Sequence, residues 1–121
     1  MKKVNLAEAF GKFSEQWSPK IAGEVNDFAV KLCKIQGEFI WHHHAEEDEL
    51  FLVISGRLGM KLRDQDDLML EAGEFVIIPH GVEHLPYAEA EVQMILLERK
   101  STLNTGTEQN ERTVEQLETL D

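Results

Sequence analysis

The sequence predicts an all-β sandwich or barrel built from many short strands. Its middle section contains apolar segments of strand length, and the densest of them is Glu49–Ile54. In the segment Leu58–Leu62 apolar and polar residues alternate, which is typical of a half-buried strand. Turn-forming pairs such as Ser55-Gly56 and Ala72-Gly73 separate these segments. Short strands joined by turns indicate a β-sandwich or a β-barrel.

The expected strands follow one another with little chain between them. The first segment contains a break near Asn26-Asp27 and ends at Gly37. Turn residues around Asp64-Gln65-Asp66 and Pro79 separate later segments. From apolar spacing and turns, we expect extended structure at residues 25–35, 39–44, 49–54, 58–62, 68–70, 74–78, 84–87 and 92–98.

The two ends of the chain are expected to be helical. An N-terminal helix is predicted at about residues 5–14, because Asn5 can cap it and Glu8 occupies the capping-box position. The C-terminal tail, residues 101–121, begins with a polar stretch. Its end, Glu111–Leu120, can form a short amphipathic helix or remain a mobile tail.

Length and composition indicate one domain. The chain has 121 residues, so we expect a single domain at 1–121 with its barrel core at about 25–100. Apolar residues make up 42% of the chain, an ordinary value for a globular protein, which argues against wholesale disorder.

Charge and cysteine content restrict the partners and the compartment. The net charge of −11 argues against nucleic acid and against anionic membrane surfaces, since both favour cationic partners. No apolar run is long enough to span a bilayer, and because no apolar stretch follows Met1-Lys2-Lys3, a secretory signal is not expected. The single cysteine, Cys33, cannot form an internal disulfide, so the cytoplasm is the expected location.

The histidines of the middle section suggest a metal site. In a strand, His42 and His44 project to the same face and His43 to the other. If the next strand pairs with this one, Glu49 can reach the same ion, and His84 is a plausible fourth ligand. Such donors bind Fe, Mn, Ni, Cu or Zn.

Less specific interpretations of these histidines remain open. The run of three could be an accidental polar stretch or the remnant of a tag, although it lies inside an aromatic segment and not at a terminus. His80 occupies a turn and is not expected to bind metal.

Two stretches of the sequence resemble the motifs of the cupin family. Gly37, His42, His44, Glu49 and Gly56 follow the first motif, G-x5-H-x-H-x3–4-E-x6-G, although Gly37 lies one residue closer to His42 than the motif asks. The chain also resembles the second motif, G-x5-P-x-G-x2-H-x3-N. It matches this motif at four positions and has Ala88 in place of the final asparagine. The four matching positions are Gly73, Pro79, Gly81 and His84. The stretch Leu103–Gly106 resembles the tail of a group of small single-domain cupins, most of which have no assigned reaction.

This resemblance implies a jelly-roll barrel of two antiparallel sheets that holds a metal ion inside. It implies that His42, His44, Glu49 and His84 bind one divalent transition metal. Four protein ligands leave positions of an octahedral shell open to a small molecule, an arrangement suited to Lewis-acid or redox chemistry.

An apolar pocket is expected next to the metal. Strand parity places two residues beside Glu49 and two beside His84, and one more lies near the start of the first motif. These pocket residues are Phe39, Phe51, Val53, Val82 and Pro86. The alternative is that they only pack the barrel. Tyr87, the one tyrosine, is a candidate proton donor, but its parity directs it away from His84.

Three functions are compatible with the sequence. The first is a metal-dependent enzyme such as a dioxygenase, isomerase or lyase acting on a small oxygenated molecule. The second is a non-catalytic module that binds or senses a small molecule through its metal, and the third is a metal-free structural barrel. We also expect a homodimer, since the outer apolar positions Leu50, Leu52 and Ile54 exceed what a thin barrel buries, and cupins commonly pair through such sheet faces.

Overall fold

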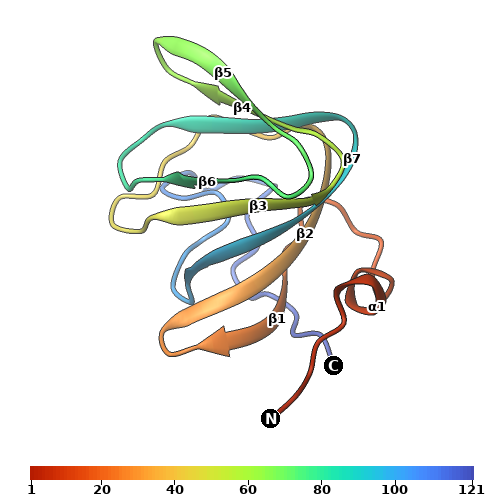
Figure 1. Cartoon of the computed structure of the whole chain (residues 1–121). Helices are drawn as coiled ribbons and strands as arrows, with labels where there is room; N and C mark the ends of the chain where they lie inside the picture. The colour runs from red at the N-terminus through yellow and green to blue at the C-terminus, as the bar shows by residue number, and fades with distance from the viewer.

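Seven antiparallel strands roll up into a barrel, and one short helix packs against its outer surface (Figure 1). The computed structural model describes all residues, 1–121. Its elements are α1 (Leu6–Phe10), β1 (Lys20–Val25), β2 (Phe28–Glu38), β3 (Glu49–Ser55), β4 (Leu58–Leu62), β5 (Gln65–Leu70), β6 (Phe75–Ile78) and β7 (His84–Arg99). The predicted all-β, jelly-roll fold class is confirmed.

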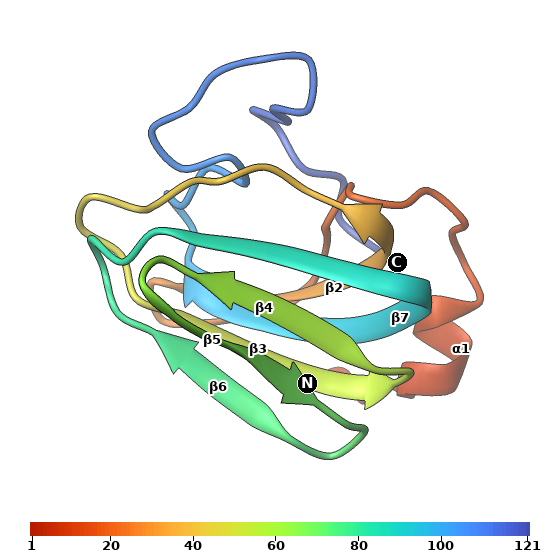
Figure 2. The same cartoon turned by 90° about the horizontal axis from the view of Figure 1, so that it is seen from above.

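Two long strands give the barrel its shape. The main strand order is β1-β2-β7-β3-β6, and β4 pairs with β5 and with β7. The start of β7 pairs with β4, and its second half pairs with β3, while β2 runs beside both parts. The two expected sheets are therefore continuous with each other through β2 and β7. Seen from above, the strands curve around a common interior (Figure 2).

Several expected elements differ in their bounds. The break near Asn26-Asp27 is the hairpin between β1 and β2, where Asn26 adopts a positive φ of 54°. The segments 84–87 and 92–98 belong to one strand, β7. The segment 39–44 forms no strand. It meets β7 through an isolated bridge between His42 and His84 and through a hydrogen bond of 3.0 Å from the Phe39 amide to the Pro86 carbonyl.

The N-terminal helix is shorter than expected, and the C-terminal helix is absent. Asn5 caps α1 as predicted, since its side chain accepts a hydrogen bond from the Glu8 amide at 3.0 Å, but the helix ends after Phe10. At the other end, the side chain of Asn104 bonds to the Arg112 carbonyl and to the Val114 amide, each at 2.8 Å. Such bonds compete with helical ones, so this part of the tail is held as turns.

The last residues of the chain lie beside β1. The Ile21 amide donates to the Glu118 carbonyl, and the Leu120 amide donates to the Ile21 carbonyl, each at 2.8 Å. The side chain of Leu120 packs with the α1 cluster. The edge strand β1 thus supplies the backbone partners that a helix would otherwise have supplied.

The barrel interior is apolar along most of its length. Inward positions of β2, β3, β4 and β7 form its core, for example Ile35, Val53, Met60 and Val92, all without exposed surface. A second, smaller cluster joins α1 to the outer face of the sheet around Leu32. No helix of the protein has the length and apolar character needed to cross a membrane.

Candidate metal centre

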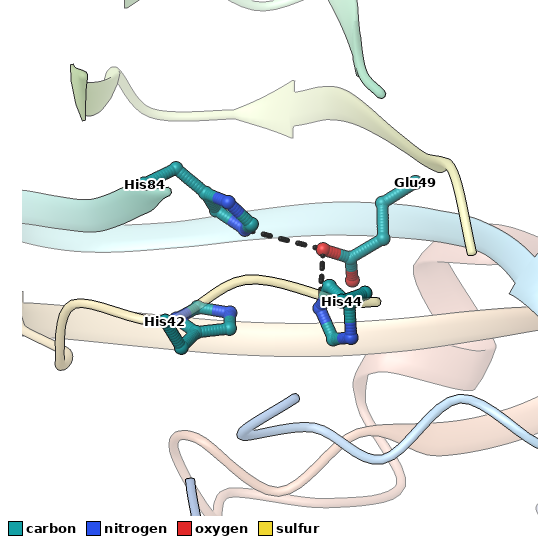
Figure 3. A group of neighbouring side chains, drawn as sticks. All are labelled: His42, His44, Glu49 and His84. Atoms are coloured by element: carbon teal, nitrogen blue, oxygen red, sulfur yellow. Dashed lines mark ion pairs between the residues drawn. The ribbon is translucent and has the colours of Figure 1, made fainter. Parts of the chain in front are cut away.

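Four buried side chains converge inside one end of the barrel (Figure 3). His42 and His44 come from the irregular segment before β3, Glu49 begins β3 and His84 begins β7. One ligand atom from each of these residues lies within 4.8 Å of the others. All four residues are at most 4% exposed. The structure therefore brings these four residues together, and Glu49 arrives by a different route from the one that the sequence suggested.

Glu49 does not return through a hairpin with the histidine segment. Its strand, β3, pairs with β6 and β7. The histidine segment is instead connected to the start of β7, where His42 and His84 exchange two backbone hydrogen bonds of 3.1 and 2.9 Å. The ligand groups of the two motifs are thus joined directly at the bridge between His42 and His84.

Backbone carbonyls orient two of the imidazole rings. Nδ1 of His42 lies 2.9 Å from the Ile40 carbonyl oxygen, and Nδ1 of His84 lies 2.9 Å from the Val82 carbonyl oxygen. A carbonyl can only accept, so in each ring Nδ1 carries the proton and Nε2 keeps its lone pair. Partners of this kind fix the tautomer and the ring direction of metal-binding histidines.

Nε2 of His42, Nε2 of His84 and the carboxylate of Glu49 are hydrogen-bond acceptors in this cluster when the rings are neutral. Nε2 of His44 and Nε2 of His84 lie 2.8 and 3.2 Å from Oε1 of Glu49. These three atoms are buried, and none has a donor. Lone pairs that face one another away from water repel, and a cation between them removes that cost. The donor set fits a divalent metal ion of the transition series.

The ionisation of the cluster suits metal binding. Burial, together with the neighbouring His84, lowers the pKa of His42 to about 4, so this imidazole is neutral at physiological pH. Burial raises the pKa of Glu49, but its neighbours, the Glu98 carboxyl first among them, outweigh burial and hold the pKa well below its usual range. Neutral imidazole and ionised carboxylate are the forms that bind metals.

Glu98 is a functional candidate that the motifs did not identify. It is 1% exposed on β7, beside Glu49, and its Oε1 accepts a hydrogen bond of 2.9 Å from Lys31 Nζ. Burial, and then the charge of Glu49, raise the pKa of Glu98 well above its usual range, and Lys31 offsets part of this rise. A signal was present in the sequence: Val92, Met94 and Leu96 alternate inward, and Glu98 continues that series.

A cavity opens beside the cluster. Its volume is about 30 Å³. Of the five expected pocket residues, Phe39, Phe51 and Pro86 line it. The structure places the other two elsewhere: Val53 is fully buried in the core and Val82 packs against that core.

Several lining residues come from outside the two motifs. Trp17 precedes β1, and its ring stacks on Phe39 with centroids 4.8 Å apart and planes 10° from parallel. Asn104 reaches the cavity from the C-terminal tail. The complete lining is Trp17, Pro19, Cys33, Phe39, His42, Glu49, Phe51, Pro86, Met94, Leu96, Glu98 and Asn104.

The remaining sequence candidates lie away from the cluster. His80 is exposed, and Asp48 accepts hydrogen bonds from its amide at 2.8 Å and from its ring at 2.9 Å. This contact joins the loops of the two motifs. Tyr87 faces away from the interior as its parity indicates, and its hydroxyl donates to Asp67 at 2.7 Å. His43 is outside the group of converging ligand atoms.

Fold and site together define a class of protein: a jelly-roll barrel with a buried cluster of three histidines and one glutamate that can hold a metal ion. The chain belongs to the cupin domain family, whose pattern matches residues 32–98, more than half of its length.

Two relatives support this membership. An uncharacterized protein of Bacillus subtilis, YdbB, is 36% identical over 83 residues, which cover 69% of this chain and 74% of that protein. The crystal structure of a cupin-2 domain containing protein from Shewanella frigidimarina is 43% identical and has a TM-score of 0.78. That match covers 80% of this chain and 94% of the other.

A known enzyme has the same fold. The hydroquinone 1,2-dioxygenase PnpCD, solved with Cd²⁺ and 4-hydroxybenzonitrile, has a TM-score of 0.68. The match covers 79% of this chain and 71% of the enzyme's chain. At 17% identity, this likeness shows a common fold.

We predict that the buried Lys31–Glu98 contact contributes to stability. Lys31→Met removes the donor to the buried Glu98 carboxyl, and a buried polar group left without its partner costs about 1–3 kcal/mol of unfolding free energy. The double variant Lys31→Met/Glu98→Gln regains part of this loss. Urea unfolding of the metal-free protein measures both effects.

An exposed ion pair provides the control for this measurement. Lys61 and Glu38 also lie 2.9 Å apart, but 37% and 59% of their side-chain surfaces are exposed. Lys61→Met should therefore cost at most about 1 kcal/mol. Equal losses in Lys31→Met and Lys61→Met would show that the buried pair has no special weight.

Proposed function

We propose that this protein is a cupin that binds one divalent transition-metal ion through His42, His44, Glu49 and His84. The observation that supports it best is the convergence of buried nitrogen and oxygen atoms that have no hydrogen-bond partner. The ion is Fe, Mn, Ni, Zn or Cu, since imidazole and carboxylate donors suit these metals. When bound, it supplies Lewis-acid or redox chemistry to a molecule that enters its coordination shell.

We further propose that the cavity binds a small oxygenated molecule and that the protein transforms it as a dioxygenase, isomerase or lyase. The Trp17–Phe39 stack and Phe51 give the cavity apolar walls that exclude water from the ligand's carbon skeleton. Glu98 gives the same cavity a carboxyl group beyond the four proposed ligands. This second carboxyl favours catalysis over simple binding, because chemistry on an oxygenated molecule needs groups that orient it.

A cytoplasmic homodimer completes the proposal. Two cross-strand rows of apolar residues run over the outer sheet face. One contains Val30, Leu97, Leu50 and Ile77, and the other contains Leu32, Ile95, Leu52 and Phe75. Helix α1 covers the Leu32 end, while Phe75 and Ile77 on the edge strand β6 are 60% and 53% exposed. A second copy of the chain would cover this apolar end.

Metal analysis tests the proposed site. Untagged wild-type protein, reconstituted with each metal in turn, should hold about one ion per chain. His44→Ala should weaken binding by more than about 100-fold, since losing a ligand exceeds the 10–100-fold effect of losing a partner of a ligand. His43→Ala, the neighbouring histidine, is the control and should bind like wild type. A wild-type protein that holds no metal after reconstitution would overturn the proposal.

Thermal shift and mass spectrometry together test the proposed chemistry. The metal-loaded protein is incubated with small phenols, hydroxy acids and oxo acids, with oxygen present. We expect one class to raise the melting temperature only when metal is bound, and to be converted to product, with both effects absent in His44→Ala. A shift without any product would support the alternative, a non-catalytic binding or sensing module.

Light scattering tests the dimer. Wild type should have twice the mass of one chain, and Phe75→Asp/Ile77→Asp should be monomeric, because charges at these positions oppose burial of the face. Both residues lie on the outer face, so the double variant should keep its metal. A wild type that stays monomeric at high concentration contradicts the dimer.

A further inference from the structure

The histidine segment is held between two parts of the chain that are far apart in sequence. On one side lies the start of β7, which bonds to His42 through His84, and the preceding loop, whose Gly81 amide donates to the His44 carbonyl at 2.7 Å. On the other side lies the C-terminal tail, drawn in blue in Figure 2. The Thr107 amide of that tail donates to the His43 carbonyl at 3.1 Å.

Gly106 sets how closely the tail approaches the histidines. It has a positive φ of 62°, and a methyl group at its α-carbon would overlap the carbonyl of His43 and lie 3.4 Å from Nδ1 of His44. The neighbour that it would meet is backbone, which cannot turn aside as a side chain can. Only glycine allows the tail to lie in this position.

The part of the tail that carries Gly106 is itself firmly held. Thr105 is fully buried, and its hydroxyl contacts the Glu108 carbonyl and, at 2.7 Å, the Thr113 hydroxyl. The Gly106 amide donates to the Leu103 carbonyl at 2.9 Å. These bonds, with those of Asn104, give the tail a fixed shape at the point of contact.

We propose that the segment Leu103–Thr107 is a positioning element of the metal centre, which fixes the backbone between His42 and His44 so that both rings remain directed at the ion. This inference rests on the metal binding proposed above. The segment supplies none of the four proposed ligands, although its Asn104 lines the cavity. It acts through the His43 carbonyl, because the histidine segment has no ladder of sheet hydrogen bonds to hold it.

The test compares two glycines that both have positive φ. Gly73 has a φ of 88°, and a methyl group on its α-carbon would meet no other atom within 4 Å, so Gly73→Ala measures the backbone cost alone. Gly106→Ala adds the collision with His43. We expect Gly106→Ala to bind metal about 10–100-fold more weakly than wild type, the usual effect of losing a partner of a ligand, and Gly73→Ala to bind within about twofold.

A spectroscopic readout separates positioning from general stability. Both variants are saturated with Co²⁺, whose visible absorption reports the geometry of its ligands, and circular dichroism monitors the fold. The band should change in Gly106→Ala and stay unchanged in Gly73→Ala. If Gly106→Ala does not fold, Thr105→Val decides, because it loosens the tail without touching the histidine segment, and it should weaken metal binding in the same direction.

The outcomes distinguish the two proposals. Wild type that binds no metal removes both the proposed site and this inference. Wild type that binds metal, together with a folded Gly106→Ala of equal affinity and equal spectrum, overturns the positioning role and leaves the site intact. If Gly106→Ala does not fold and Thr105→Val binds metal with wild-type affinity, the positioning role is overturned as well.

Discussion

The centre of this protein depends on one constraint: buried lone pairs that face each other need a positive charge between them. Carbonyls fix the protons of His42 and His84 on Nδ1, so their Nε2 atoms have only lone pairs to offer. Glu49 is ionised in the same buried space. A cluster of this kind is unfavourable by itself, and the rest of the barrel must hold it together until a cation compensates.

The long strands β2 and β7 provide that support. They pair along most of their length, so they bring the side chains of Lys31 and Glu98 into contact, while β7 also begins with His84. Lys31 thus places a cation near the carboxyl groups of Glu98 and Glu49, outside the histidine cluster. Strand β7 thus carries one proposed ligand, His84, at its start and the polar group that borders the cavity, Glu98, near its end.

Local patterns predicted an all-β fold, and the resemblance to the cupin motifs supplied the jelly roll and the set of four residues that converge. Alternation identified the strands, and spacing with strand parity separated His42 and His44 from His43. The sequence could not show that 39–44 stays outside the sheet, because its aromatic residues favour a strand while its actual partners, His84 and Thr107, are distant. Trp17 and Asn104 were missed for the same reason, since only tertiary packing brings them to the cavity. The prediction of a C-terminal helix was wrong. The side chain of Asn104 and the backbone of Ile21 form hydrogen bonds with tail backbone groups that would have paired with each other in a helix.

The irregular histidine segment gives the four proposed ligands two different mechanical supports. Glu49 and His84 begin strands of the hydrogen-bonded ladder, whereas His42 and His44 lie on a segment secured by a handful of backbone bonds. Segments of this kind open locally at a lower free energy than the strands, on a faster timescale than global unfolding. Amide exchange should therefore be faster at 42–44 than in β7, and an ion would leave by detachment of the histidine pair while the barrel stays folded. The lifetime of the loaded state is then a property of this short segment and not of the whole domain.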